Sequence, residues 1–192
     1  MVGGAGNMAR KKRIKAEQIL DKAYEIVLTD GLKSITARKL ATALNCSTQP
    51  IYLEFGSMSE LKQAVLEHAK ARLIWYVSEE QHHDDALVNL GVGYIRFATV
   101  EPELYRALFI DNHFGAAETR AFVNQVTDIR LHDYQPLQRL TKEQQQQVVN
   151  EIWITMTGFA TLINAHLVQF DEESASMQIG VMLMRCFELE RV

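Results

Sequence analysis

The chain has 192 residues, of which 47% are hydrophobic and 23% are charged, and this composition excludes a disordered chain. Its formal net charge of -4 is unevenly distributed: residues 1–58 hold nine Lys/Arg and five Asp/Glu, whereas residues 59–192 hold eleven and nineteen. A basic N-terminal part on an acidic body predicts that only the first part meets a polyanion.

The residue pattern predicts an all-α fold of about nine helices. Prolines occur only at Pro50, Pro102 and Pro136, helix-forming residues fill the long segments, and β-branched runs with period-2 alternation are absent. The two cysteines, Cys46 and Cys186, form no CxxC motif, and the N-terminus lacks the apolar region of a signal peptide. We therefore expect reduced thiols and a cytoplasmic protein.

One segment has nearly the length of a membrane span. Residues 152–170 contain no Asp, Glu, Lys or Arg. They do contain threonines, an asparagine, a histidine and a glutamine, which is more typical of a helix surrounded by protein. The prediction is a buried helix and no membrane partner.

The chain begins with a basic arm, residues 1–13, which we expect to be mobile and which includes Lys11, Lys12 and Arg13. Such a cluster is either a solvated tail or a phosphate-binding arm that attracts DNA without regard to sequence. A helix over residues 15–29 follows, with its apolar stripe facing a core. Asp30-Gly31 ends this helix, because glycine accepts the left-handed conformation.

Residues 36–55 read as two short helices joined by a tight turn. Thr36 is a suitable N-cap for the first helix, and Asn45 tolerates the positive φ that the turn needs. Ser47 is expected to cap the second helix. Pro50 then lies in the first turn of this helix, where a missing N–H costs little, and we expect the start of the helix to be irregular.

The second short helix is expected to have polar side chains on its outer face. With Ile51 and Phe55 turned to the core, Thr48, Gln49 and Tyr52 face outward. Each could be an ordinary exposed residue. Their joint position at the start of the second helix of a helix-turn-helix favours contacts with base edges and phosphates in a DNA major groove.

The stretch Leu44-Asn45-Cys46-Ser47-x-x-x-Ile51-Tyr52-x-x-Phe55, with Leu61 and Ala64-Val65 after it, resembles the DNA-binding signature of the TetR family of transcriptional regulators. The resemblance covers about residues 14–65. It implies a homodimeric helix-turn-helix protein with a larger C-terminal helical domain for a small ligand. It also implies that a defined set of positions contacts DNA: Thr36, Arg38, Thr48, Gln49 and Tyr52.

Three positions depart from the family signature. Asn45 stands where the family has glycine, Glu54 where it has histidine, and Met58 where it has lysine. The last two positions usually touch phosphate, so their loss should weaken backbone contacts. Affinity is then expected to come from Arg38, Lys39, the basic arm and the dimer, with Ser47 as a further contact.

The remaining residues, 59–192, are predicted to form a ligand-binding and dimerisation domain after a DNA-binding domain at 14–58. Helices are expected from Ser57 or Ser59 to about 77, over 86–99, from Pro102, over 118–131, over 142–168, and from Asp171 or Ser174 to the C-terminus. The patterns S-x-x-E at Ser57 and TKEQ at Thr141 predict capping boxes. The run QHHDD is expected to be a loop and not a metal site, because adjacent residues rarely converge on one ion.

Apolar residues at helical spacing give candidates for a ligand pocket, although plain core packing is the commoner role of such residues. The candidates are Tyr94, Phe97, Tyr105, Phe109, Trp153, Met156 and Phe159. They would suit a small apolar or aromatic ligand. The family resemblance further implies that the last two helices pair with those of a second subunit. The interface candidates are Gly158, Met177, Gly180, Val181, Met184 and Phe187.

The sequence therefore predicts a transcriptional regulator, a repressor, that binds a near-palindromic operator in double-stranded DNA as a homodimer and is released by a small-molecule effector. The alternative is a structural DNA-binding protein that responds to no ligand. An enzyme is disfavoured, because the chain shows none of the common catalytic motifs, and neither a cofactor nor a catalytic residue is predicted.

Overall fold

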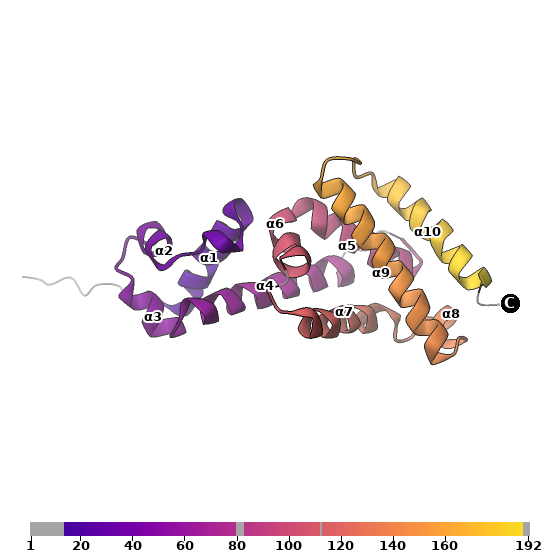
Figure 1. The fold of residues 1–192 in the computed structure, drawn as a ribbon, viewed down its shortest axis with the longest axis horizontal. Helices are drawn as coiled ribbons and strands as arrows, with labels where there is room; N and C mark the ends of the chain where they lie inside the picture. The colour runs from indigo at the N-terminus through magenta and orange to yellow at the C-terminus, as the bar shows by residue number, and fades with distance from the viewer. Residues whose placement is uncertain (1–13, 80–82, 112, 190–192) are drawn as a thin grey trace, which may run out of the picture.

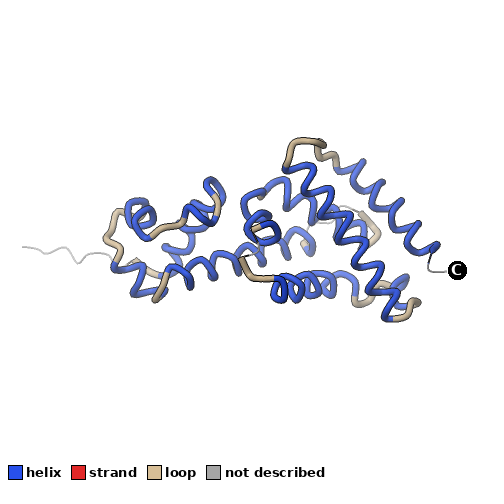
Figure 2. Tube along the Cα trace, viewed as in Figure 1, coloured by secondary structure: helices blue, strands red, loops and turns tan. Residues whose placement is uncertain are grey.

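The computed structural model describes residues 14–79, 83–111 and 113–189. Every regular element in these ranges is a helix (Figure 2). The predicted all-α class is confirmed, with ten α-helices in the described residues and two shorter helical turns between them. None of these helices is long and apolar enough to cross a membrane.

The N-terminal part is a small three-helix unit at one end of the elongated molecule (Figure 1). It consists of α1 (Ala16–Asp30), a 3₁₀ turn η1 (Leu32–Ser34), α2 (Ala37–Ala43) and α3 (Gln49–Phe55). Apolar side chains from all three helices are buried in a shared core: Ile19, Ala23 and Val27 of α1, Leu40 of α2 and Ile51 of α3. A helix as short as α3 has little stability alone, so it depends on this burial, which also fixes its position against α1 and α2.

The predicted caps form at Thr36 and Thr141, but the predicted box at Ser57 forms only in part. Thr36 Oγ1 accepts a hydrogen bond from Lys39 N at 3.2 Å, as predicted. The capping box at Thr141 is complete, since Gln144 Oε1 also accepts from Thr141 N at 2.9 Å. The box predicted at Ser57 is only half formed, because Ser57 N donates to Phe55 O at 2.7 Å and is not available to Glu60.

Helix α4 (Met58–Ser78) runs out of the N-terminal unit and into the larger helical body (Figure 1). Buried residues Leu61 and Val65 lie in its first half and Leu73 and Val77 in its second half, so one helix belongs to both cores. A change in its tilt therefore moves the N-terminal unit relative to the body.

Helix α5 (Ala86–Val100) is the centre of the body. It packs against α4, α7, α9 and α10, and nearly all of its side chains are buried. Two glycines permit this crowding: a Cβ on Gly93 would lie 2.6 Å from Tyr76 O, and one on Gly91 would lie 2.7 Å from Ile179 Cδ1. The backbone of α4 thus touches α5 directly.

The rest of the body departs from the predicted bounds in places. After α6 (Pro102–Tyr105) the chain widens into a π-helical turn, η2 (Arg106–Ile110), which the sequence did not indicate. Then come α7 (Ala116–Leu131), a short α8 (Gln135–Gln138), α9 (Lys142–Asn164) and α10 (Glu172–Leu189). Helix α9 ends four residues earlier than predicted, because His166 takes a left-handed φ of 57° that no α-helix continues through.

Candidate DNA interface and ligand sites

The turn between α2 and α3 has the geometry that its sequence predicts. Asn45 has φ 50°, and Cys46 N donates to Ala41 O at 2.9 Å, which closes the turn. The prediction for Ser47 is wrong in one respect: α3 begins after Thr48, and neither residue caps it through a side chain. Thr48 has helical dihedral angles, and its carbonyl accepts from Ile51 N, so the chain enters α3 through a tight turn without needing a polar cap.

Helix α3 presents the predicted contact side chains on one exposed surface. Ile51 is 1% exposed, which fixes the inner side of the helix. Thr48, Gln49 and Tyr52 are exposed, and Ser47 lies beside them in the turn. Their donors and acceptors match those of base edges and phosphates. The role of each in DNA contact stays a prediction.

Leu53 is exposed on the same surface but was not among the predicted contacts. Leu53 lies four residues after Gln49, so both side chains lie on one side of the helix. This spacing can be read from the sequence. Leu53 was not predicted because the expected contacts were based on hydrogen-bonding groups, which leucine lacks.

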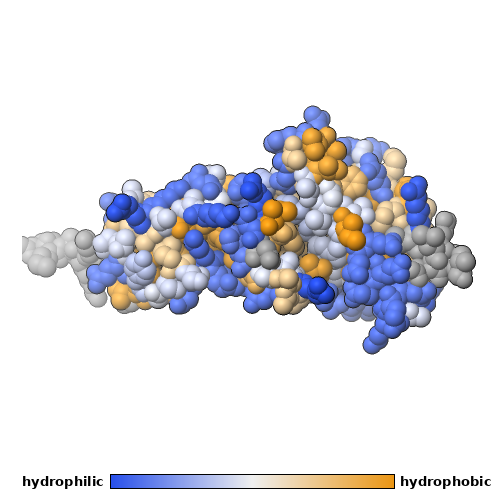
Figure 3. Space-filling model, in the orientation of Figure 1, coloured by the Kyte–Doolittle hydropathy of each residue, from blue (hydrophilic) through white to orange (hydrophobic). Residues whose placement is uncertain are grey.

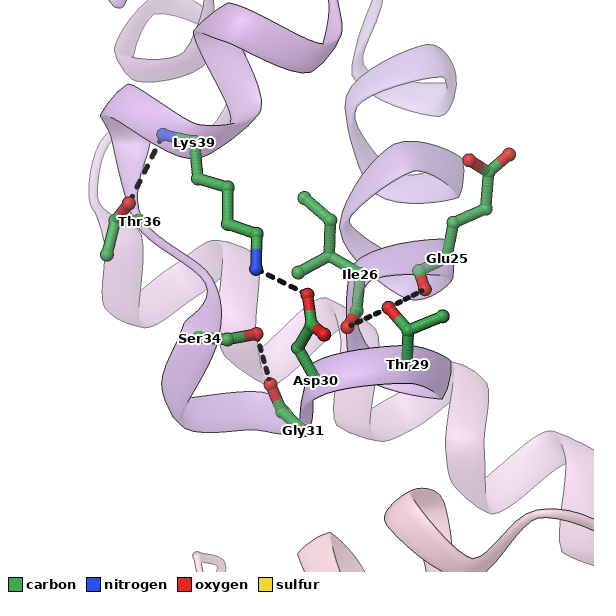
Figure 4. A network of polar contacts seen from close by, with 8 residues as sticks. All are labelled: Glu25, Ile26, Thr29, Asp30, Gly31, Ser34, Thr36 and Lys39. Atoms are coloured by element: carbon green, nitrogen blue, oxygen red, sulfur yellow. Dashed lines mark hydrogen bonds and ion pairs between the residues drawn. The ribbon is translucent and has the colours of Figure 1, made fainter.

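The two cations at the start of α2 differ in what they already bind. Lys39 Nζ donates to Asp30 Oδ2 at 2.5 Å, which ties α2 to the end of α1 (Figure 4). That hydrogen bond holds the pKa of Asp30 below its usual range. Arg38 forms no side-chain hydrogen bond or ion pair with the described residues. It lines a shallow hollow with Thr42, Asn45, Ser47 and Thr48. Arg38 is thus the freer of the two to meet a phosphate.

Other predicted features of this unit are placed as follows. Lys11, Lys12 and Arg13 lie outside the described residues. Met58, which stands at the position of the family's lysine, packs partly buried against the core. Because a thioether there offers no donor to phosphate, α4 begins without a cation at this position.

In the body, four of the ligand candidates form one aromatic cluster. The ring of Tyr94 lies 5.0 Å from Trp153, 5.4 Å from Phe109 and 5.9 Å from Tyr105, all edge to face. Phe97 packs instead against Tyr76 of α4, at 5.7 Å. Met156 is fully buried near Gly91, and Phe159 is partly buried against the core.

The polar atoms of this cluster differ in whether they have a hydrogen-bond partner. Trp153 Nε1 donates to Thr127 Oγ1 at 3.0 Å, and the Tyr94 hydroxyl lies 3.4 Å from Thr157 Oγ1. Burial raises the pKa of Tyr94 well above its usual value, so the phenol is neutral at physiological pH. The buried Tyr105 hydroxyl has no hydrogen-bond partner among the described residues. It is the atom here that a polar ligand group would satisfy.

A cavity of about 830 Å³ lies elsewhere, between the start of α5, α8, the start of α9 and α10. None of the predicted ligand residues lines it, whereas five predicted interface residues do: Met177, Gly180, Val181, Met184 and Phe187. At its inner end Tyr134 donates to Asp85 Oδ2 at 2.8 Å. Asp85 Oδ1 caps α5 by accepting from two backbone N–H groups, so this carboxylate already has three donors.

Helices α9 and α10 expose apolar side chains to solvent. Ile154 is 73% exposed, Met177 and Met184 are each 63% exposed, and Val181 is 41% exposed. A Cβ on Gly158 or Gly180 would meet nothing within 4 Å, so no packing within the described chain requires these glycines. In Figure 3 hydrophobic surface also gathers where α9 turns into α10, the part of the chain that holds the exposed Leu167 and Val168.

The N-terminal unit touches the body through α6 and η2. A Cβ on Gly31, at the end of α1, would lie 2.7 Å from Glu103 Oε2. Lys33 Nζ lies 3.6 Å from Asp111 Oδ1, at the end of η2. Close by, Arg72 Nε of α4 donates to the buried Glu101 at 2.6 Å. The segment that carries Tyr105 and Phe109 therefore also contacts the N-terminal unit.

Comparison with known proteins agrees with this architecture. A family model described as "Tetracyclin repressor-like, C-terminal domain" matches residues 87–182. No curated protein matches the chain. A crystal structure of a TetR-family transcriptional regulator from Streptomyces coelicolor is similar, with a TM-score of 0.65 at 15% identity over 90% of this chain and 88% of that one.

A second similar structure is that of the multidrug binding protein EbrR complexed with imidazole. Its TM-score is 0.61 at 16% identity, and the likeness covers 94% of this chain and 97% of that one. At these identities the two structures show a shared fold. With the family model they establish that the chain belongs to the TetR family of transcriptional regulators.

Proposed function

We propose that the protein is a repressor that binds a near-palindromic operator as a homodimer and leaves it when a small molecule binds the body. The observation that carries the proposal is the exposed surface of α3. Gln49 and Tyr52 stand free of the core at the start of a short helix, held by buried Ile51. A helix presented in this way fits the major groove, where its first residues reach base edges.

Two copies of this surface are needed for a palindromic site. The exposed apolar residues of α9 and α10 support pairing there, because a monomer would leave them in water. Gly158 supports it further, since a helix-interior glycine costs about 1 kcal/mol relative to alanine and nothing among the described residues needs its small size.

The contacts between the DNA-binding unit and the body support a response to ligand. Tyr105 and Phe109 belong to the aromatic cluster, and the same α6–η2 segment meets α1 and η1 through Glu103 and Asp111. A ligand that binds the cluster in a rearranged state would shift this segment. The ligand changes DNA affinity only if it binds the rearranged state more tightly than the DNA-bound state.

Selection of bound sequences from random duplex DNA, using the full-length protein, tests the proposal. We expect an inverted repeat. Repeating the selection with a library of apolar and aromatic compounds should identify at least one that releases the repeat. An absence of any preferred sequence would point instead to a structural DNA-binding protein.

The variant Gln49→Ala refines the same test. A bidentate contact from Gln49 to adenine predicts that preference relaxes at one or two base pairs, at a cost of about 1–3 kcal/mol. Binding titrations on the selected duplex and on single-base variants measure this. If Gln49→Ala weakens binding equally on every sequence, then Gln49 contacts phosphate and does not read a base.

A further inference from the structure

Leu53 is a hydrophobic side chain that α3 holds out in solvent, 70% exposed. The inner side of the helix is set by Ile51, which is 1% exposed, and by Phe55, which is partly buried against the core. At 3.6 residues per turn, positions 49 and 53 lie on the opposite side. Leu53 therefore stands one turn after Gln49 on the part of α3 that points away from the protein.

Single exposed leucines are common on protein surfaces and need no explanation by themselves. The surroundings of this one carry the argument. Gln49 and Tyr52 on the same surface are exposed, and the glutamine can pair with a base edge. Leu53 cannot donate or accept a hydrogen bond, so any base it meets is recognised by apolar contact alone.

The major groove presents one apolar group to such a side chain, the 5-methyl group of thymine. We propose that Leu53 reads a thymine methyl in each half-site, and this inference rests on the proposed function. Four helical residues rise about 6 Å, and stacked bases are about 3.4 Å apart. The thymine therefore lies about two base pairs from the pair that Gln49 contacts.

This contact gives α3 a second source of sequence selectivity that is independent of hydrogen bonds. Cytosine carries no methyl group at the same position, so it leaves the leucine facing water and a polar edge. Burying one methyl group corresponds to roughly a fourfold change in affinity. The effect is modest at one half-site and is doubled in free energy on a palindrome.

The first experiment repeats the selection from random duplexes with Leu53→Ala. We expect the wild-type consensus to contain one thymine per half-site at which the variant has no preference, while all other positions stay unchanged. Leu167→Ala is the matched control, because Leu167 is 72% exposed but lies after α9 in the body. Circular dichroism and size-exclusion chromatography check that each variant keeps its fold and assembly.

The second experiment removes the methyl group from the DNA. Deoxyuridine replaces the implicated thymine in the selected duplex, and affinity is measured by fluorescence anisotropy. The wild type and Leu167→Ala should each lose roughly fourfold per half-site. Leu53→Ala should bind the thymine duplex at least as weakly as the wild type binds the uridine duplex, and should lose clearly less than fourfold per half-site on uridine.

The outcomes are distinct. If uridine weakens the wild type and Leu53→Ala equally, or weakens neither, then Leu53 does not read the methyl group and the inference is overturned while the regulator remains. If the wild type selects no sequence at all, then the proposed function fails and this inference fails with it.

Discussion

At the scale of single residues, the charge that this protein can offer to DNA depends on what each cation already binds. The sequence predicts both Arg38 and Lys39 as sources of affinity, together with the basic arm and the dimer. In the structure Lys39 is held by Asp30, whereas the Arg38 side chain lines an open hollow. Sequence spacing could not reveal this pairing, because Asp30 and Lys39 meet only through the turn of the chain around η1 (Figure 4).

The substitution Asp30→Asn tests whether this pair restrains DNA binding. Neutralising the carboxylate frees Lys39 for phosphate, so we expect tighter binding and a slope of log K against log salt that is steeper by about one unit. Fluorescence anisotropy of the selected duplex between about 50 and 200 mM salt measures both quantities. Asp21→Asn is the control, because Asp21 is exposed on α1 and forms no ion pair with the described residues. Equal slopes in the two variants would contradict the restraint.

The same ion pair has a defined pH dependence. The pKa of Asp30 is lowered in the folded state by the hydrogen bond from Lys39. Its contribution to stability is therefore present above the ordinary aspartate pKa of about 3.9 and is lost as the pH falls through the lowered value. Because both side chains stay largely in solvent, salt weakens the contribution as well.

At the scale of elements, helix bounds and caps were largely predictable, because they depend on a few neighbouring residues. Thr36, Asn45 and Thr141 occupy the conformations that local chemistry assigns to them. Close approaches between helices were not predictable. The sequence offered Gly158 and Gly180 only as candidates for a subunit interface, and within the described chain the tight contacts between helices occur at Gly91 and Gly93. Which glycine meets a neighbour depends on the tertiary arrangement.

Gly93→Ala tests the direct contact between α4 and α5. The added Cβ would lie 2.6 Å from Tyr76 O and 3.1 Å from Val77 Cα, so backbone would have to move. We expect the free energy of unfolding to fall by about 1–3 kcal/mol, despite the higher helix propensity of alanine. Gly91→Ala is matched to it on the same helix, and its obstacles are the ends of Ile179 and Met156, which can shift. Denaturant titration that found equal losses would argue against backbone contact as the cause.

At the scale of the whole molecule, the sequence predicted an N-terminal helix-turn-helix unit and a larger helical body, but not how the two contact each other. The cavity under α10, the contact of α6 with α1 and the ion pair of Lys33 with Asp111 join segments far apart in the chain. Neither the cavity nor these contacts can be recognised from a periodic pattern of residues in the sequence. The π-helical turn at Arg106–Ile110 also lies outside the common sequence patterns, and such turns often occur at functional sites. Here it follows Tyr105, whose buried hydroxyl has no partner among the described residues.

The proposed operator binding depends on pairing of subunits through α9 and α10. Ile154→Glu places a carboxylate on the exposed apolar side of α9, where the Ile154 side chain is 73% exposed and contributes little to the core of one subunit. An unpaired charge buried between subunits is strongly unfavourable, so we expect the variant to be a folded monomer by light scattering. Its affinity for a single half-site should equal that of one wild-type subunit. It should lose the additional affinity for the full operator that two linked N-terminal units provide. Ile129→Glu makes the same change on α7, away from this face, and should leave both assembly and operator affinity unchanged. A dimeric Ile154→Glu protein with normal operator affinity would place the subunit interface on another surface.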